Sequence, residues 1–376
     1  MLKRILAIAK KEVRELKRDK RMLYVLFVFP FVLLILFGYA INFDVHHIKM
    51  AVYDQNKSAE SREFINRLIS SDYFDYVKSI NSESEIRGIL DENVAQTVIV
   101  IPEDFSKNIH SNKEAKVQIL IQGIDANTAS VILNYMNAAT ATYTQKIAKE
   151  AFAARGRKAY LPINLEPRFW YNPDLNSTMF LIPGLISFIL IMTAVISIAL
   201  SIVREKERGT MEQINVSPLS SLELLIGKTT PYTVIALVVA GIILFAGYIL
   251  FGVTIKGSVF YLFISTLIFL FASLDLGILV SSISDSQQVA FQIAALISLL
   301  PSFLLSGFVF PIESMPPVIQ VLTNITPVKF YIIILRDILL KGVGIEAFWN
   351  QIIYLMIFAT FFLTVASLIN KKKKTA

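Results

Sequence analysis

The chain has 376 residues, of which 55% are apolar and only 17% are charged, and its net charge is +7. Soluble globular domains contain about 45–50% apolar and about 25% charged residues, so this composition argues against a single soluble domain. Disordered chains are charge-rich and poor in apolar residues, so disorder is excluded. The chain has no cysteine and three histidines. Disulfides and thiolate metal sites are therefore excluded, and we expect no metal centre.

The first 21 residues are a basic segment with nine lysines and arginines. Its apolar residues recur at helical spacing, at Leu2, Ile5, Leu6, Ala9, Val13 and Leu16. This pattern predicts, over residues 1–21, a cytoplasmic amphipathic helix that lies on the inner membrane surface. A simple basic flank that orients the first span is the alternative.

Six uncharged or nearly uncharged runs are long enough to cross a bilayer, which takes about 20 apolar helical residues. They predict transmembrane spans at 22–42, 176–203, 229–255, 257–282, 287–310 and 347–370. The fourth run contains the one acid deep inside a span, Asp275. Acids inside a membrane are costly and usually face the bundle interior or water. A proton- or cation-coupling role and a structural hydrogen bond beside Ser273 or Ser281 both remain open.

The basic residues are distributed unevenly around these runs. Residues 1–21, the loop 204–228 and the basic tail 371–376 together carry 17 lysines and arginines, whereas the opposite short segments carry four. The positive-inside rule places the richer side in the cytoplasm, so we expect both termini there. The net charge then reflects membrane topology, and we expect a lipid bilayer rather than nucleic acid as the partner of these residues.

Residues 43–175, between the first two spans, have the balanced composition of a soluble domain, with 17 acidic and 15 basic residues. Apolar runs predict strands at 48–53, 97–101 and 117–121, with weaker candidates at 74–80 and 163–171. The pattern predicts helices at 58–70, 82–93, 104–111 and 127–155. Strand–helix alternation indicates an α/β domain. The predicted fold is therefore an α-helical polytopic membrane protein with six transmembrane helices and an inserted extracytoplasmic α/β domain.

The segment 311–346 departs from the pattern of long spans. It contains four prolines that break a continuous helix, at Pro311, Pro316, Pro317 and Pro327. Much of the segment is nevertheless apolar. Irregular backbone at membrane depth is tolerated only where protein covers it or water reaches it. We therefore expect short re-entrant or interfacial helices at the outer face.

Two sets of short motifs carry a resemblance to a known family. The first set comprises Pro183-Gly184-Leu185, the run 204–213 (REKERGTMEQ), Ser217-Pro218-Leu219 and Gly227-Lys228. The second set comprises the run 305–316 (LSGFVFPIESMP), Asn324, Thr326-Pro327 and Leu335-Arg336. Together they resemble the type-2 membrane subunit, or permease, of ATP-binding-cassette exporters. The large domain after the first span resembles that of bacterial multidrug-type permeases in position and size.

The resemblance implies a bacterial inner-membrane permease that pairs with a second copy or with a paralogous permease. Two ATPase subunits would dock on the cytoplasmic face and would bind ATP and magnesium, while this chain would bind no cofactor. The resemblance also leaves room for a periplasmic adaptor. The loop 204–228 would hold the coupling helix that contacts the ATPase. The outer re-entrant motif would comprise Gly307, Pro311, Glu313 and Pro316.

The charged run in the loop 204–228 fits a coupling role on physical grounds. Residues 204–208 are expected to extend the second span beyond the membrane as an exposed charged helix, and Gly209 permits a sharp turn. Thr210 and Gln213 fit a capping box for a short helix that follows. The expected coupling residues are Arg204, Glu205, Glu207, Arg208, Gly209, Thr210 and Glu212. A solvated hairpin of mixed charge is the alternative.

Gly227-Lys228-Thr229 looks like the end of a nucleotide-binding loop, but that motif requires a glycine where Leu222 stands. We therefore expect a transport subunit that is not an enzyme, with ATP hydrolysis in a separate partner. The expected function is export of an apolar or amphipathic substrate, such as a drug or lipid, from the cytoplasm or the inner leaflet.

Three other functions are alternatives to this one. A secondary transporter would show inverted repeats and several intramembrane charges, and neither is evident. A membrane-anchored assembly or sensory protein, whose outer domain binds a partner, would not need the charged run 204–213. A membrane enzyme would need a carboxylate pair, a Ser/His array or a metal cluster at the membrane face, and the sequence offers none.

Overall fold

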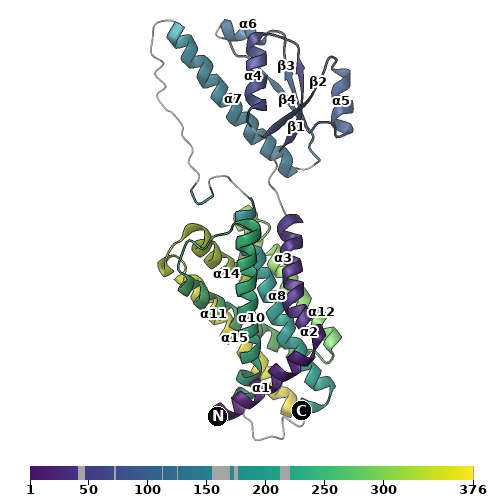
Figure 1. The fold of residues 1–376 in the computed structure, drawn as a ribbon, viewed down its shortest axis with the longest axis vertical. Helices are drawn as coiled ribbons and strands as arrows, with labels where there is room; N and C mark the ends of the chain where they lie inside the picture. The colour runs from purple at the N-terminus through teal and green to yellow at the C-terminus, as the bar shows by residue number, and fades with distance from the viewer. Residues whose placement is uncertain are drawn as a thin grey trace. The chain divides into compact units, whose positions relative to one another are not determined.

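A computed structural model describes residues 1–40, 47–71, 73–111, 113–124, 126–154, 170–172, 177–211 and 221–375. The chain divides into two compact units. One unit combines Met1–Asn42 with Arg168–Ala376, and the other is Phe43–Pro167. The first unit is helical, and the second contains a four-stranded sheet (Figure 1).

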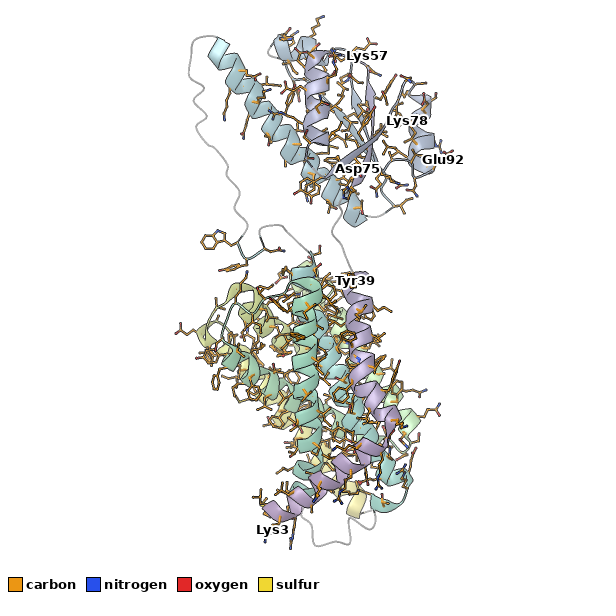
Figure 2. The ribbon with its side chains drawn as sticks, viewed as in Figure 1. Lys3, Tyr39, Lys57, Asp75, Lys78 and Glu92 are labelled. Carbon is orange, nitrogen blue, oxygen red and sulfur yellow. The ribbon has the colours of Figure 1, made fainter. Side chains whose placement is uncertain are left out.

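The helical unit consists of long helices joined by short helical turns. Its first part comprises α1 (Leu2–Arg18), α2 (Lys20–Leu23), η1 (Tyr24–Val28) and α3 (Phe29–Ala40). The long helices that follow are α8 (Ser177–Glu207), α10 (Ser221–Phe251), α11 (Val259–Ile283), α12 (Gln287–Leu304) and α15 (Trp349–Thr375). The shorter ones are η2 (Ile312–Ser314), α13 (Pro317–Leu322), η3 (Thr323–Ile325), α14 (Pro327–Arg336), η4 (Asp337–Lys341) and η5 (Ile345–Ala347). Figure 2 marks the two ends of this unit by Lys3 on α1 and Tyr39 on α3.

Five of these helices are long and apolar enough to cross a membrane: α8, α10, α11, α12 and α15. A sixth candidate is the bent pair Pro317–Ile325 and Pro327–Lys341, whose two arms meet at 93°. In the first predicted span, the structure has a shorter apolar helix, Tyr24–Tyr39. The described chain is thus mostly helical with five or six candidate spans, which is the architecture of a polytopic membrane protein.

Helix α8 lies at the centre of the unit. It is contacted by α3, α10, α11, α12 and α14, and 94% of its most apolar stretch is buried. A helix that is apolar on every face is stable only when other helices surround it or lipid does. The apolar sequence of α8 is therefore compatible with its central position, although α10, whose apolar stretch is only 33% buried, is just as apolar.

The helix boundaries differ from the predicted spans in one informative place. Helix α10 already begins at Ser221, inside the predicted loop 204–228. An uncharged run marks only the part of a helix that suits hydrocarbon. The helix itself continues into the polar region, because Glu223 and Lys228 are compatible with helical backbone.

The segment 311–346 is covered by protein on one side. Tyr331 on α14 is fully buried, and its hydroxyl shares a hydrogen bond of 2.8 Å with Thr266 on α11. The Tyr331 ring also stacks on Phe269, with ring centroids 4.0 Å apart. These contacts give the short helix α14 a fixed place against the long helix α11.

The second unit is a small α/β unit. Its sheet has the order β2-β1-β3-β4, in which β1 pairs in parallel with β2 and β3, and β4 is antiparallel to β3. The strands are β1 (Ile48–Asp54), β2 (Phe74–Ser79), β3 (Thr97–Ile101) and β4 (Gln118–Ile121). The helices are α4 (Ala59–Ile69), α5 (Ser84–Asp91), α6 (Phe105–His110) and α7 (Ala126–Ala154). Four of the five predicted strands are therefore present, and most of the fifth, 163–171, lies outside the described residues.

The two faces of this sheet bury different side chains. Met50 and Val52 of β1 pack with Phe64 of α4 and Ile132 of α7, whereas Ala51 between them packs with Ile86 of α5. Side chains of a strand alternate between faces, so one strand supplies both cores. Helices α4 and α7 thus cover one face of the sheet and α5 the other (Figure 1).

Candidate functional site

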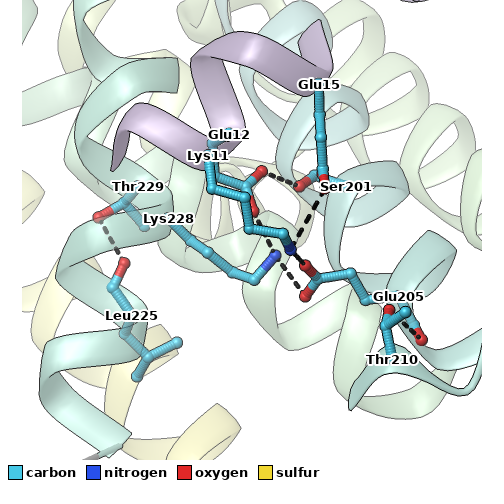
Figure 3. Close-up of polar contacts among 9 residues, drawn as sticks. All are labelled: Lys11, Glu12, Glu15, Ser201, Glu205, Thr210, Leu225, Lys228 and Thr229. Atoms are coloured by element: carbon cyan, nitrogen blue, oxygen red, sulfur yellow. Dashed lines mark hydrogen bonds and ion pairs between the residues drawn. The ribbon is translucent and has the colours of Figure 1, made fainter. Parts of the chain in front are cut away.

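A buried ion-pair network joins three helices at one end of the helical unit. Lys228 of α10 lies between Glu12 of α1 and Glu205 of α8 (Figure 3). The Lys228 Nζ is 2.8 Å from the Glu12 Oε1 and 2.6 Å from the Glu205 Oε2. The three side chains are only 2%, 2% and 6% exposed. Buried ion pairs therefore connect helices that are far apart in the sequence.

Two further side chains complete the network. The Ser201 hydroxyl of α8 donates a hydrogen bond of 2.9 Å to the Glu12 Oε2. The half-exposed Lys11 ammonium donates to Glu205 and lies 3.4 Å from Glu15. Each carboxylate of the buried pair thus has two partners, as a buried charge requires if its desolvation is to be offset.

The acidic groups of this network could be mistaken for a metal site. Carboxylate oxygens of Glu12, Glu15 and Glu205 lie within 4.8 Å of one another. However, the ammonium groups of Lys11 and Lys228 already contact these oxygens and supply the positive charge. The arrangement is therefore an ion-pair network, and the described residues around it offer no vacant set of metal ligands.

Gly227 explains how α1 comes close enough to take part. A Cβ atom at this position would lie 2.8 Å from the Ile8 Cβ and 3.2 Å from the Ile5 backbone oxygen. Only a residue without a side chain leaves room for α1 at this crossing. The Gly227-Lys228 pair is thus a helix-crossing point followed by a buried base, which is a different role from the nucleotide-binding loop it resembles.

The charged run at the end of α8 makes further contacts with neighbouring helices. Arg204 forms an ion pair with Asp19, which lies between α1 and α2, and its Nε donates to the Gln287 Oε1 of α12 at 3.3 Å. Glu207 accepts a hydrogen bond of 2.6 Å from the Gln287 backbone N–H. Lys206 donates to the Ser281 carbonyl of α11. The expectation of an exposed charged helix over 204–208 is therefore wrong for Glu205, because a lysine from α10 and one from α1 neutralise it inside the bundle.

The other predicted coupling residues lie at the end of the charged run or directly after it. Arg208 and Gly209 are exposed, and Gly209 has a φ of +69°, the left-handed conformation that its turn was expected to need. The Thr210 hydroxyl donates to the Glu205 carbonyl at 3.2 Å. Glu212 and Gln213 lie outside the described residues.

Sequence reasoning missed Glu12 and the partner role of Lys228. Glu12 occupies the apolar side of α1, since Ile5, Ile8, Glu12 and Leu16 recur at three- and four-residue steps. Glu12 is an acid at a position where the helix pattern predicts an apolar residue. This mismatch is the signal that could have identified Glu12 as a site residue. Its partners lie 189 and 216 residues away, at Ser201 and Lys228, so the pairing itself requires the tertiary structure.

A second cluster brings together residues from both sets of motifs. A Cβ on Gly184 of α8 would lie 2.3 Å from the Phe308 ring, so the missing side chain lets this ring lie on the α8 backbone. The Arg336 guanidinium donates to the carbonyl oxygens of Phe180 at 3.1 Å and Gly307 at 2.9 Å. It also lies over the Phe180 ring, 3.7 Å from the centroid. Gly307 has a φ of +78°, which favours glycine at the turn.

The remaining predicted site residues lie apart from both clusters. Pro311 and Pro316 precede η2 and α13, and together with Glu313 they are exposed. Asp275 is only partly exposed. Ser273 and Ser281 each donate to a carbonyl of their own helix.

The fold and these clusters define a polytopic helical membrane protein whose α1, α8 and α10 are joined by buried charge. Comparison with known proteins then gives the family: residues 20–368 match the ABC-2 family transporter protein, and the chain belongs to this family. It is 30% identical over 352 residues to the probable multidrug ABC transporter permease YbhR of Escherichia coli K12. This match covers 94% of this chain and 94% of YbhR.

Other relatives support the same assignment. The chain is 29% identical over 372 residues to the probable multidrug ABC transporter permease YbhS of Escherichia coli K12, covering 99% of this chain and 97% of YbhS. It is 29% identical over 378 residues to the inner membrane transport permease YhhJ of Escherichia coli K12. This match covers 98% of this chain and 96% of YhhJ. The resemblance inferred from the motifs is therefore confirmed, and family membership implies an ABC ATPase partner.

Proposed function

We propose that the chain is the permease subunit of an ATP-driven exporter of the bacterial inner membrane, and that a separate ATPase docks beside the Gly209 turn. The observation that carries this proposal is the buried network of Glu12, Glu205 and Lys228, which ends one turn before Gly209. A force applied to the turn would move α1, α8 and α10 together, because the ion pairs oppose their separation. Such a unit suits transmission of ATPase motion to the spans.

The permease would act with a second copy or a paralogous permease, and both termini would lie in the cytoplasm. The 17-to-4 asymmetry of basic residues supports this orientation. The chain has no native cysteine, so single cysteines introduced at positions 100 and 315 would report the topology. Labelling of either cysteine only after the inner face is made accessible would reverse the proposed orientation.

The coupling proposal is tested by Gly209→Val in the complex with the ATPase. Valine resists the φ of +69°, and left-handed backbone costs about 1–2 kcal/mol for a residue with a Cβ. No atom of the described residues lies within 4 Å of the Gly209 Cβ position, so the change strains the turn without a clash among them. We expect weaker co-purification of the ATPase and lower transport-stimulated hydrolysis.

Gly344→Val is the matched control for this experiment. Gly344 also has open space around its Cβ position, but its φ is −81°, which valine adopts freely. If Gly209→Val and Gly344→Val bind and stimulate the ATPase equally, the turn is not the coupling element. Glu212→Lys, which reverses a charge in the same loop, provides an independent second variant.

An apolar cavity supports an apolar or amphipathic cargo. A cavity of about 650 Å³ lies between α8, α10 and α11 and is lined almost entirely by apolar side chains. This volume falls within the ~300–1,000 Å³ typical of small-molecule sites. Gly241 of α10 lines it and has no atom within 4 Å of its Cβ position, so a leucine there would occupy the cavity without a clash.

Gly241→Leu is therefore expected to lower transport of a bulky apolar substrate while leaving basal ATP hydrolysis unchanged. Gly88→Leu in α5 is the matched control, since Gly88 is also helical and has open space around its Cβ position. Equal transport by the two variants across a panel of drugs and lipids would remove the cavity from the substrate route.

A further inference from the structure

A polar cleft lies beside the ion-pair network, where the chain bends between α1 and α2. Its volume is about 940 Å³, and its walls come from the end of α1, from α2, from the end of α8 and from the start of α12. Asp19 makes the bend. Its Oδ1 accepts a hydrogen bond of 3.0 Å from the Met22 N–H, and its Oδ2 pairs with Arg204. The cleft is therefore held open by an anchored corner of the backbone.

The charges around the cleft do not balance. Its two acids already have basic partners, since Glu15 lies 3.4 Å from Lys11 and Asp19 pairs with Arg204. Arg18, Lys20 and Arg208 also line the cleft and are exposed. Within the part of the chain that the structure describes, none of these three cations forms an ion pair. The cleft thus presents three positive charges to a ligand.

The deeper part of the cleft is apolar. Met22, Val25 and Leu200 line it, and Met22 is only 3% exposed. Val25 belongs to the apolar helix Tyr24–Tyr39, and Leu200 belongs to the central span α8. Cations at the rim and apolar side chains below them match a ligand that has a negative head and an apolar body. An acidic protein surface would match the rim but not the apolar side chains.

We propose that this cleft binds an anionic phospholipid of the membrane. Arg18, Lys20 and Arg208 hold the phosphate, and the first methylene groups of the acyl chains lie against Met22, Val25 and Leu200. Basic pockets beside membrane spans bind anionic headgroups in this way. Because Arg204 lies in the last turn of α8 and Arg208 follows that helix directly, a bound lipid contacts both the α1–α2 corner and the charged run before Gly209.

The test is phospholipid binding by the full-length chain in neutral detergent, measured by native mass spectrometry. Phosphatidylglycerol is the anionic probe, and phosphatidylcholine is the probe without net charge. We expect preferential retention of phosphatidylglycerol. Each basic residue near an anionic surface is worth about a fivefold change in affinity, so the double variant Arg18→Gln/Lys20→Gln should weaken phosphatidylglycerol binding about 25-fold.

Lys10→Gln/Arg14→Gln is the matched control. Both residues are exposed on the same helix α1 and lie outside the cleft, so the change in net charge is identical. This control should bind phosphatidylglycerol as the parent does, and Arg18→Lys should retain most of the binding. Equal losses in the two double variants, or no preference for phosphatidylglycerol, would overturn the proposal.

The same variants separate this site from the proposed coupling function. Lipid binding is measured without ATPase or transport. The result therefore tests the lipid proposal independently of the permease assignment. If Arg18→Gln/Lys20→Gln weakens co-purification of the ATPase but leaves phosphatidylglycerol binding unchanged, the occupant of the cleft is the protein partner, and the lipid proposal is wrong.

Discussion

The two clusters of the helical unit hold helices together by different chemistry. In the ion-pair network, Lys228 is neutralised by Glu12 and Glu205. In the second cluster, Arg336 bonds to two backbone carbonyls and lies on an aromatic ring, with no carboxylate within ion-pair distance among the described residues. The first cluster therefore depends on charge balance, whereas the second depends on the flat shape of one cation.

The largest effect is expected where charge balance is lost. Lys228→Met leaves Glu12 and Glu205 buried without their shared base, and removal of one partner from a buried ion pair costs about 3–5 kcal/mol. The midpoint of thermal unfolding of the purified chain measures this loss. Lys256→Met is the control, because Lys256 is exposed.

The same network offers a rescue that sharpens the test. A triple variant with Glu12→Gln, Glu205→Gln and Lys228→Met has no buried charge left to neutralise, and neutral replacements of buried ion pairs are often tolerated. We expect it to be more stable than Lys228→Met alone. A triple variant that is less stable than the single one would mean that packing, not charge, accounts for the loss.

A smaller effect is expected in the second cluster, where Arg336→Lys keeps the charge but removes the flat guanidinium. Lysine cannot stack on Phe180 and reach both carbonyl oxygens in the same way. A desolvated cation–π contact is worth up to about 2 kcal/mol, so the expected loss of stability is about 1–2 kcal/mol. Arg87→Lys, at a side chain that is 91% exposed, is the control. Equal unfolding midpoints for the two variants would contradict a role for stacking.

The smallest effect is expected for Glu207→Gln, at the exposed end of the charged run. Glu207 is exposed and contacts Gln287, whereas Glu205, two residues earlier, is buried between two lysines. Glu207→Gln should leave the unfolding midpoint unchanged, while Glu205→Gln should lower it, because Lys228 then loses a charged partner. Similar midpoints for the two variants would mean that burial does not distinguish these neighbouring acids.

The sequence predicts local structure better than it predicts these clusters. The alternation in β1 and the turn at Gly209 follow from side-chain period and backbone freedom, which are properties of neighbouring residues. The burial of Glu205 could not be predicted, because a charge after a long apolar run has the same sequence context whether water or a lysine from another helix neutralises it. The Gly227-Lys228 pair stands out as a short motif in the sequence, but its partners on α1 lie more than 200 residues away, so the pairing requires the tertiary structure.

The distance along the chain between Glu12 and Lys228 also has a consequence for biosynthesis. The two residues are 216 positions apart, and chains are synthesised at about 5–20 residues per second. Helix α1 therefore emerges roughly 10–40 s before the lysine that will neutralise Glu12. For most of this interval the newly made helix α1 has neither α8 nor α10 to pack against. Its basic residues give it an affinity for the bilayer surface, which would keep it beside the insertion site until the later spans arrive.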